Sequence, residues 1–287
     1  MALLIEQAVN GLQLSMLLFL ISSGLALTFG MMQVVNLAHG SLYMLGAFIG
    51  LAAHAASGSF VLGLAAGALA TALCGLVLEQ MLFKPLYPRG FHAQALMTFG
   101  LIFFFDELVQ IIWGADIKSL TVPAALDGTT LIGGATVSLY RLFLIGCGLL
   151  LALVLAGVFT GTRLGAVIRA CVDDREAAES LGLQVPRVFT LVFVVGAALA
   201  GAAGFLAVPL FTAFTGMGND TLILALVVVV LGGMRSVLGA FVGSLVVGFS
   251  LSIGQILIAG YANAVVYVVL AIVLLVRPAG LIGGEAR

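Results

Sequence analysis

The stretch of sequence that decides the fold is residues 7–78, which read QAVNGLQLSMLLFLISSGLALTFGMMQVVNLAHGSLYMLGAFIGLAAHAASGSFVLGLAAGALATALCGLVL. These 72 residues, between Glu6 and Glu79, contain no Asp, Glu, Lys or Arg. A helix rises about 1.5 Å per residue and the hydrocarbon core of a bilayer is about 30 Å thick, so the stretch is long enough to cross a membrane about three times. Its long apolar runs favour helices over the alternating strands of a barrel.

The composition of the whole chain leads to the same conclusion. Of its 287 residues, 63% are hydrophobic and 8% are charged, and the mean hydropathy is +1.29. A soluble domain carries about 25% charged residues, so this composition excludes a water-soluble protein. The net charge of −1 gives no indication of nucleic-acid binding. We therefore expect an all-α, polytopic transmembrane helical bundle that forms a single domain over residues 1–287.

Apolar segments predict eight or nine transmembrane helices. The segments lie at residues 9–30, 40–56, 60–78, 93–113, 141–160, 188–208, 220–233, 237–258 and 261–276. The segment at 220–233 is short, so it is either a crossing or a half-helix. Thirty-seven glycines indicate close helix packing, because small residues let helix backbones approach each other in lipid. Gly63 with Gly67, and Gly239 with Gly243, predict such contacts within the bundle rather than self-association.

Basic residues predict the orientation, because Lys and Arg gather in cytoplasmic loops. Lys84 and Arg89 share one loop, four arginines lie in the loop 161–187, and Arg277 and Arg287 are near the end of the chain. If all three groups are cytoplasmic, the N-terminus lies outside and the C-terminus inside. The N-terminal residues lack the basic region of a cleaved signal peptide.

No metal site, cofactor site or disulfide is expected. The cysteines are odd in number, far apart and without a CxxC pair, so we expect them to be small core residues; they are Cys74, Cys147 and Cys171. His54 and His92 lie near predicted loops, where we expect them only to bind water. Protease and esterase motifs are also absent from the sequence.

The loop 161–187 is the most polar part of the chain and holds eight of its 23 charges. Within it, residues 173–182 predict a short helix. Asp173 is the expected N-cap, with Glu176 as its capping-box partner, and Gly182 suits the left-handed position after the helix. Arg175 is expected to pair with Glu179, four residues on. Such a helix either binds a cytosolic partner or is a solvated loop helix without one.

The sequence of this predicted helix is similar to a known motif. Glu176-Ala177-Ala178-x-x-x-Gly182 resembles the EAA motif of ABC-importer permeases, although the Leu-Pro tail of that motif is missing. The resemblance implies that the helix fits into a groove on a cytosolic ATPase. It assigns ATPase coupling to Asp173, Arg175, Glu176, Ala177, Ala178 and Gly182.

Several further blocks are similar to one branch of that family, the LivH-type permeases of branched-chain amino-acid importers. They are Gly24 to Gly30, Val35-Asn36-Leu-Ala-His39-Gly40-Ser, Gly232-Gly-Met-Arg-Ser236, and Arg277-Pro-Ala-Gly280-Leu281. Arg235 departs from the small residue expected there. The resemblance implies a permease subunit in a bacterial inner membrane. It also implies a second, LivM-like permease or a second copy of this chain as partner, two cytosolic ABC ATPases, and a periplasmic amino-acid-binding protein. No GxxxxGK[ST] loop can be written, because neither of the lysines follows a glycine, so ATP hydrolysis is expected in separate subunits.

A polar break between the first two segments is the first candidate for the substrate path. It contains Asn36, His39, Ser41 and Tyr43. Unwound backbone and a new helix N-terminus present partial charges that suit a substrate carboxylate or ammonium group. The alternative is structural: Asn36 and Ser41 cap helix ends, and His39 bonds to a backbone carbonyl.

Asp106 and Glu107 are the second candidates for the path. A carboxylate inside the membrane is a candidate functional residue, and it would bind the ammonium group of an amino acid favourably. If the membrane interface begins near residue 108, the two side chains simply contact water.

The sequence leaves the exact substrate open. Related permeases handle urea, amides or aromatic acids. Two other classes compete with an ABC permease: a proton-coupled secondary transporter that uses Asp106 or Glu107, and a membrane-embedded enzyme. An enzyme is disfavoured because adjacent residues on a helix do not face each other, which leaves no visible catalytic pair.

Overall fold

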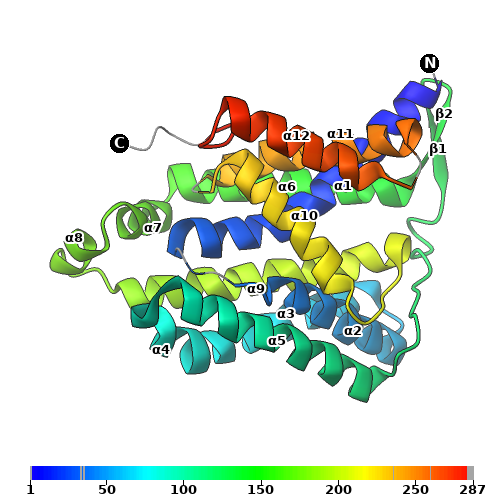
Figure 1. Ribbon diagram of the computed structural model, residues 1–287. Helices are drawn as coiled ribbons and strands as arrows, with labels where there is room; N and C mark the ends of the chain where they lie inside the picture. Colours follow the sequence, from blue (N-terminus) through cyan, green and yellow to red (C-terminus); the bar gives the residue numbers. More distant parts are fainter. Residues whose placement is uncertain (1, 33, 35, 235, 259, 283–287) are drawn as a thin grey trace.

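The computed structural model describes residues 2–32, 34, 36–234, 236–258 and 260–282, which form a helical bundle with one small hairpin (Figure 1). Within these residues, seven helical runs are long and apolar enough to cross a membrane. Their main helices are α1 (Ala2–Leu25), α2 (His39–Ser57), α3 (Phe60–Leu78), α5 (Gly90–Trp113), α6 (Leu139–Gly161), α9 (Val185–Phe211) and α11 (Val237–Leu257). Two of the runs continue into π-helical turns, η1 (Ala26–Met31) after α1 and η2 (Glu79–Phe83) after α3.

Two further apolar helices are shorter. They are α10 (Met217–Gly232), with 16 residues, and α12 (Ala262–Val276), with 15. At about 1.5 Å per residue, neither reaches the full thickness of about 30 Å without help from flanking residues. All nine predicted segments are therefore helical, and the short segment at 220–233 is confirmed as short. The length of α12 also agrees with the predicted segment at 261–276.

The basic loops lie together at one end of the bundle, as expected (Figure 1). That end holds the short elements α4 (Lys84–Leu86), η3 (Tyr87–Arg89), α7 (Arg163–Asp173) and α8 (Arg175–Ser180), and also the last turn of α12. We call it the basic end. Arg235 and Arg287 fall outside the described residues.

The opposite end carries the start of α1 and a β-hairpin that the sequence did not indicate (Figure 1). Strand β1 (Thr129–Ile132) pairs antiparallel with β2 (Ala135–Ser138). Gly133 and Gly134 form the turn with φ of 57° and 86°, the left-handed conformation that two-residue hairpin turns favour. The hairpin leads directly into α6.

Glycines bring the central helices into backbone contact. α9 packs against both α2 and α3. A side-chain carbon added at Gly204 of α9 would overlap the carbonyl oxygen of Tyr43 in α2, and Gly46 of α2 faces Gly201 of α9 equally closely. Such contacts replace the hydrophobic drive that is missing between helices in lipid.

Both predicted glycine pairs pack within the bundle. Gly67 of α3 faces the carbonyl of Gly46 in α2, and Gly63 lies against the ring of Phe205 in α9. In α11, Gly239 and Gly243 lie against the backbone of α10. The interpretation of these glycines as intramolecular packing positions is confirmed.

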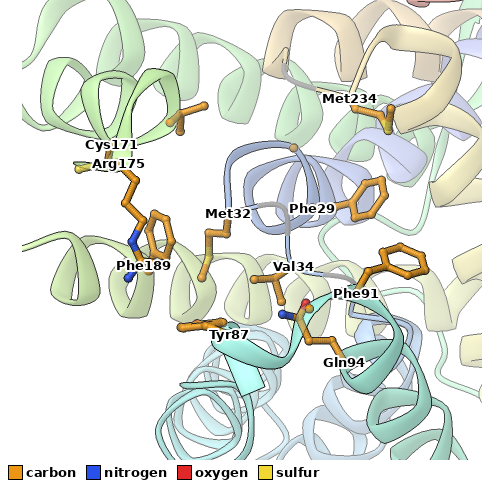
Figure 2. A pocket seen from close by; sticks show the side chains of 13 residues that line it. Phe29, Met32, Val34, Tyr87, Phe91, Gln94, Cys171, Arg175, Phe189 and Met234 are labelled. Atoms are coloured by element: carbon orange, nitrogen blue, oxygen red, sulfur yellow. The ribbon is translucent and has the colours of Figure 1, made fainter. Parts of the chain in front are cut away.

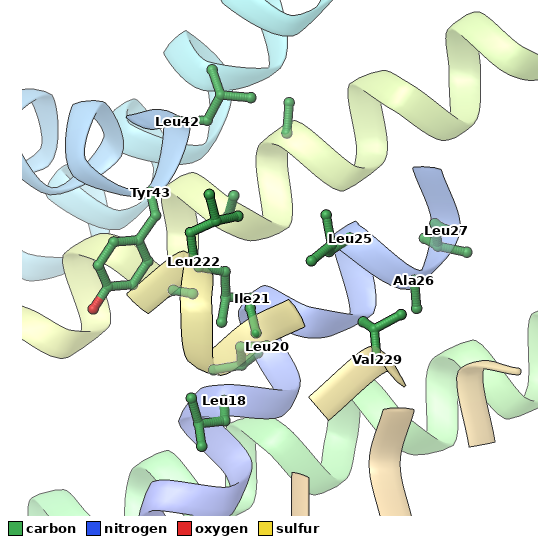
Figure 3. Packing of buried hydrophobic residues seen from close by; sticks show 14 of the residues in the cluster. Leu18, Leu20, Ile21, Leu25, Ala26, Leu27, Leu42, Tyr43, Leu222 and Val229 are labelled. Atoms are coloured by element: carbon green, nitrogen blue, oxygen red, sulfur yellow. The ribbon is translucent and has the colours of Figure 1, made fainter. Parts of the chain in front are cut away.

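The apolar core runs through the bundle, and part of it lies where α1, α2 and α10 meet (Figure 3). Ile21 and Leu25 of α1, Leu42 of α2 and Val229 of α10 are all almost completely buried. α1 also packs along α11 and α9. The first apolar segment of the chain is thus the inner helix of the bundle, not an anchor at its edge.

Candidate functional site

Helix α8, which carries the EAA-like sequence, forms at the basic end. Its N-cap residue differs from the predicted one. Asp174, not Asp173, is the N-cap of α8: its carboxylate accepts a hydrogen bond of 2.9 Å from the Ala177 amide. Asp173 is the last residue of α7, so its backbone is already helical and it cannot occupy the extended N-cap position. The predicted capping box of Asp173 with Glu176 is therefore wrong, because the helix begins one residue later.

The end of α8 matches the expectation. Gly182 has a φ of +81°, its amide bonds to the Glu179 carbonyl at 3.0 Å, and the Leu183 amide bonds to the Ala178 carbonyl at 3.1 Å. These two bonds make a Schellman motif, which requires a left-handed residue at the glycine position. Arg175 pairs with Glu179 at 3.1 Å, as predicted.

The residues that the EAA resemblance assigned to coupling differ in exposure. Ala178 is buried against the bundle, whereas Glu176, Ala177 and Gly182 are exposed. One side of this short helix therefore attaches to the permease body, and the other remains open at the basic end.

The polar break after η1 is buried inside the bundle. α2 begins at His39, and its N-cap is Ala38, which makes no side-chain capping bond. The alternative in which Asn36 and Ser41 cap this helix is wrong, since neither residue occupies the N-cap. His39 does bond to a backbone carbonyl, with Nε2 lying 3.1 Å from the Ile21 oxygen.

Two polar side chains at the break have no hydrogen-bond partner among the described residues. They are the amide of Asn36 and the hydroxyl of Ser41, both buried. Buried polar groups normally form hydrogen bonds. Groups without a partner beside a helix break can therefore bind a polar ligand that passes through the bundle. Tyr43 is also buried, and its hydroxyl bonds to the Thr221 side chain of α10.

Asp106 and Glu107 have different surroundings. Asp106 of α5 is half-buried and accepts a hydrogen bond of 3.4 Å from the Asn219 side chain of α10, whereas Glu107 is exposed. The neighbouring residue Gly218 packs backbone to backbone on Gly40 at the start of α2. The first turn of α10 thus contacts both the helix break and Asp106, and the structure separates Asp106 from Glu107.

A cavity of about 620 Å³ occupies the basic end of the bundle, and no sequence pattern predicted it. Arg175 of α8, Phe189 of α9, Tyr87 of η3 and Gln94 of α5 line it, together with Val34 from the helix break (Figure 2). The cavity therefore reaches from α8 to the helix break. Gln94, a polar residue near the start of an apolar segment, was a weak sequence signal for it.

Metal-binding and redox features do not appear in the described part of the chain. No three His, Cys, Asp or Glu side chains come together there. The cysteines are free; Cys171 is buried, and Cys74 and Cys147 are half-buried.

A multi-pass helical bundle with a buried polar break and a cavity leading to an exposed, capped helix defines a membrane transport protein. The chain belongs to the family described as "Branched-chain amino acid transport system / permease component", whose model matches residues 7–276. It is a permease subunit.

Relatives of the chain are similar over nearly their whole length. The high-affinity branched-chain amino acid transport system permease protein BraD of Pseudomonas aeruginosa is 29% identical, over 97% of this chain and 95% of the relative. LivH of Escherichia coli K12, described in the same words, is 27% identical over the same shares. No solved structure gives a significant match.

Proposed function

We propose that this chain is one permease half of an ATP-driven importer for branched-chain or other small apolar amino acids in a bacterial inner membrane. The observation that carries the proposal is the continuity of the site: the exposed helix α8, the cavity and the buried helix break adjoin one another in one subunit. The names of the relatives and the mostly apolar cavity wall support the choice of substrate class.

Each part of the site has a role in this proposal. The exposed face of α8 binds a cytosolic ATPase, which makes the basic end cytoplasmic. The polar atoms of Asn36 and Ser41 offer hydrogen bonds to the charged ends of the amino acid, while Asp106 favours its ammonium group. The cavity is the inner vestibule, from which the substrate leaves toward the cytoplasm.

In the proposed complex this chain contacts four kinds of partner. A second permease, either LivM-like or a second copy of this chain, covers an exposed helical face. Two ABC ATPases bind the α8 helices, and a periplasmic binding protein delivers substrate at the hairpin end. The outward apolar faces that remain contact lipid; α12, for example, has Val266 as its one buried residue.

The test is uptake of radiolabelled leucine into proteoliposomes. We expect uptake only when this chain is assembled with its permease, ATPase and binding-protein partners and ATP is present on the ATPase side. Uptake by this chain alone, driven by a proton gradient, would instead establish the secondary transporter that uses Asp106 or Glu107. Competition by urea, amides or aromatic acids in the assembled complex would reassign the substrate.

A substitution just after α8 tests the role of this helix in coupling. Gly182→Val places a β-branched residue at φ +81°, which strains the end of the helix. We expect normal insertion but ATP hydrolysis uncoupled from uptake, measured as substrate moved per ATP consumed. Gly134→Ala, also at positive φ but at the opposite end, is the control. Normal coupling in Gly182→Val would remove α8 from the ATPase interface.

A further inference from the structure

Glu79 is a buried carboxylate that the substrate path and the coupling motif leave unexplained. Its side chain is 0% exposed, and it is the only Asp, Glu, Lys or Arg buried to this degree in the described part of the chain. It stands at the point where α3 changes into the π-helical turn η2. Single π-helical turns occur frequently at functional sites, and a buried carboxylate is costly unless its oxygens are bonded.

Two hydroxyl groups from different elements satisfy this carboxylate. Tyr87 of η3 donates to Glu79 Oε1 at 3.0 Å, and Thr190 of α9 donates to Oε2 at 2.9 Å. Burial and the negative charge of Glu79 raise the pKa of Tyr87, so the phenol stays protonated and remains a donor. Glu79 therefore ties η3 and α9 to the end of α3.

A chain of ring contacts continues from Tyr87 to the coupling helix. The Tyr87 ring meets the Phe189 ring edge to face, with centroids 6.2 Å apart. The guanidinium of Arg175, the first residue of α8, lies over the Phe189 ring at 5.5 Å. Figure 2 shows these three side chains on one side of the cavity. Arg175 thus reaches the buried carboxylate through two aromatic rings.

We infer that Glu79 is a positioning residue that transmits the movement of α8 to the α3–α9 pair, through Tyr87, Phe189 and Arg175. The inference rests on the proposed function, since α8 moves only if an ATPase binds it. Because Tyr87, Phe189 and Arg175 line the cavity, a displacement of α8 changes the cavity wall and the packing of α9 together. Glu79 keeps η3 and α9 in place relative to the end of α3, because its hydrogen bonds to Tyr87 and Thr190 involve a charge and are therefore stronger than neutral ones.

The test compares Glu79→Gln and Tyr87→Phe with the wild type. Both substitutions nearly keep the side-chain volume and remove or weaken a charge-assisted hydrogen bond. We expect the amount of leucine transported per ATP hydrolysed to fall about tenfold, the effect of losing one such bond. Glu79→Asp, which keeps the charge, should recover part of the loss. Thr98→Val is the matched control, because it removes a buried hydroxyl of α5 that bonds only within its own helix.

A second measurement needs no ATPase. Hydrogen exchange of the α8 amides in the purified permease should be faster in Glu79→Gln and Tyr87→Phe than in the wild type and in Thr98→Val. Wild-type exchange and wild-type coupling in both variants would overturn the inference, as would an equal loss of coupling in Thr98→Val. If the wild-type complex shows no ATP-driven uptake but the exchange difference is present, the proposed function fails while the mechanical link from Glu79 to α8 stands.

Discussion

Several polar residues in this membrane bundle are held by specific contacts with a neighbouring helix. His39 bonds to the Ile21 carbonyl, Tyr43 reaches Thr221, and Asp106 accepts from Asn219. Each of these pairs joins two helices and gives a polar side chain a hydrogen-bond partner where lipid offers none. Asn36 differs in leaving both of its side-chain polar atoms without a partner among the described residues.

Replacement of His39 tests whether this side chain of the helix break contributes to transport. We expect His39→Ala to lower the free energy of unfolding by about 1–3 kcal/mol, since it removes a buried hydrogen bond. Transport kinetics in the reconstituted complex should change without loss of assembly. His92→Ala, an exposed histidine of α5, is the control and should match the wild type. Unchanged kinetics in His39→Ala would leave this residue with a structural role only.

The two aspartates before α8 give a matched pair. Asp174→Ala removes the side chain that accepts from the Ala177 amide, and should destabilise the helix by about 1 kcal/mol. Asp173→Ala should have little effect, because Asp173 belongs to the preceding helix. Hydrogen exchange at Ala177 measures the difference. Equal protection in the two variants would show that the cap does not hold the helix.

Helices in this protein meet through backbone rather than through long side chains. The contacts of α2 with α9 and α10 depend on glycines at positions where the carbonyl of one helix touches the Cα of the other. These contacts place His39 and Tyr43 of α2 inside the bundle, so helix packing decides the environment of the candidate path.

Gly204→Ala tests this packing. The added methyl group would overlap the Tyr43 carbonyl oxygen, and a backbone atom cannot move aside by changing rotamer. We expect a loss of about 1–3 kcal/mol or more, seen as a lower thermal melting midpoint in detergent. Gly157→Ala on α6 is the control, because nothing lies within 4 Å of its added methyl group. It should melt at or above the wild-type temperature.

The whole molecule is polarised between a basic end and a hairpin end. The proposed function makes the basic end cytoplasmic, in agreement with the tendency of Lys and Arg to remain inside. The exposed residue Leu181 lies just after α8, and the exposed residue Leu131 lies in β1, at the opposite end.

Orientation can be measured with single cysteines at these two positions, in a chain whose native cysteines are replaced by alanine. Leu131→Cys should react with a membrane-impermeant maleimide in intact cells. Leu181→Cys should react only in inside-out vesicles. Leu131 is 76% exposed and Leu181 is 80% exposed, so a difference in labelling reports the side of the membrane and not burial. The reverse labelling pattern would invert the proposed topology.

The sequence by itself determined the class of fold and the features that depend on near neighbours. The charge-free run 7–78 could only be helical membrane segments, and Gly182 marked the end of α8 because its φ depends on local backbone sterics. The Arg175–Glu179 pair followed from helical spacing. The sequence predicted the N-cap of α8 one residue too early. The reason is that α7 extends through Asp173, and the local sequence does not show where α7 ends.

Tertiary structure alone decided which polar groups are enclosed and where space remains. Glu79 lies next to a glutamine and near Lys84 in the sequence, and in that context looks like the start of a solvated loop. Packing by η3 and α9 buries it completely. The cavity likewise joins residues of α5, α8 and α9 that are far apart in the sequence. Burial and cavities depend on how distant segments fill space together, and a local pattern of residues carries no information about that.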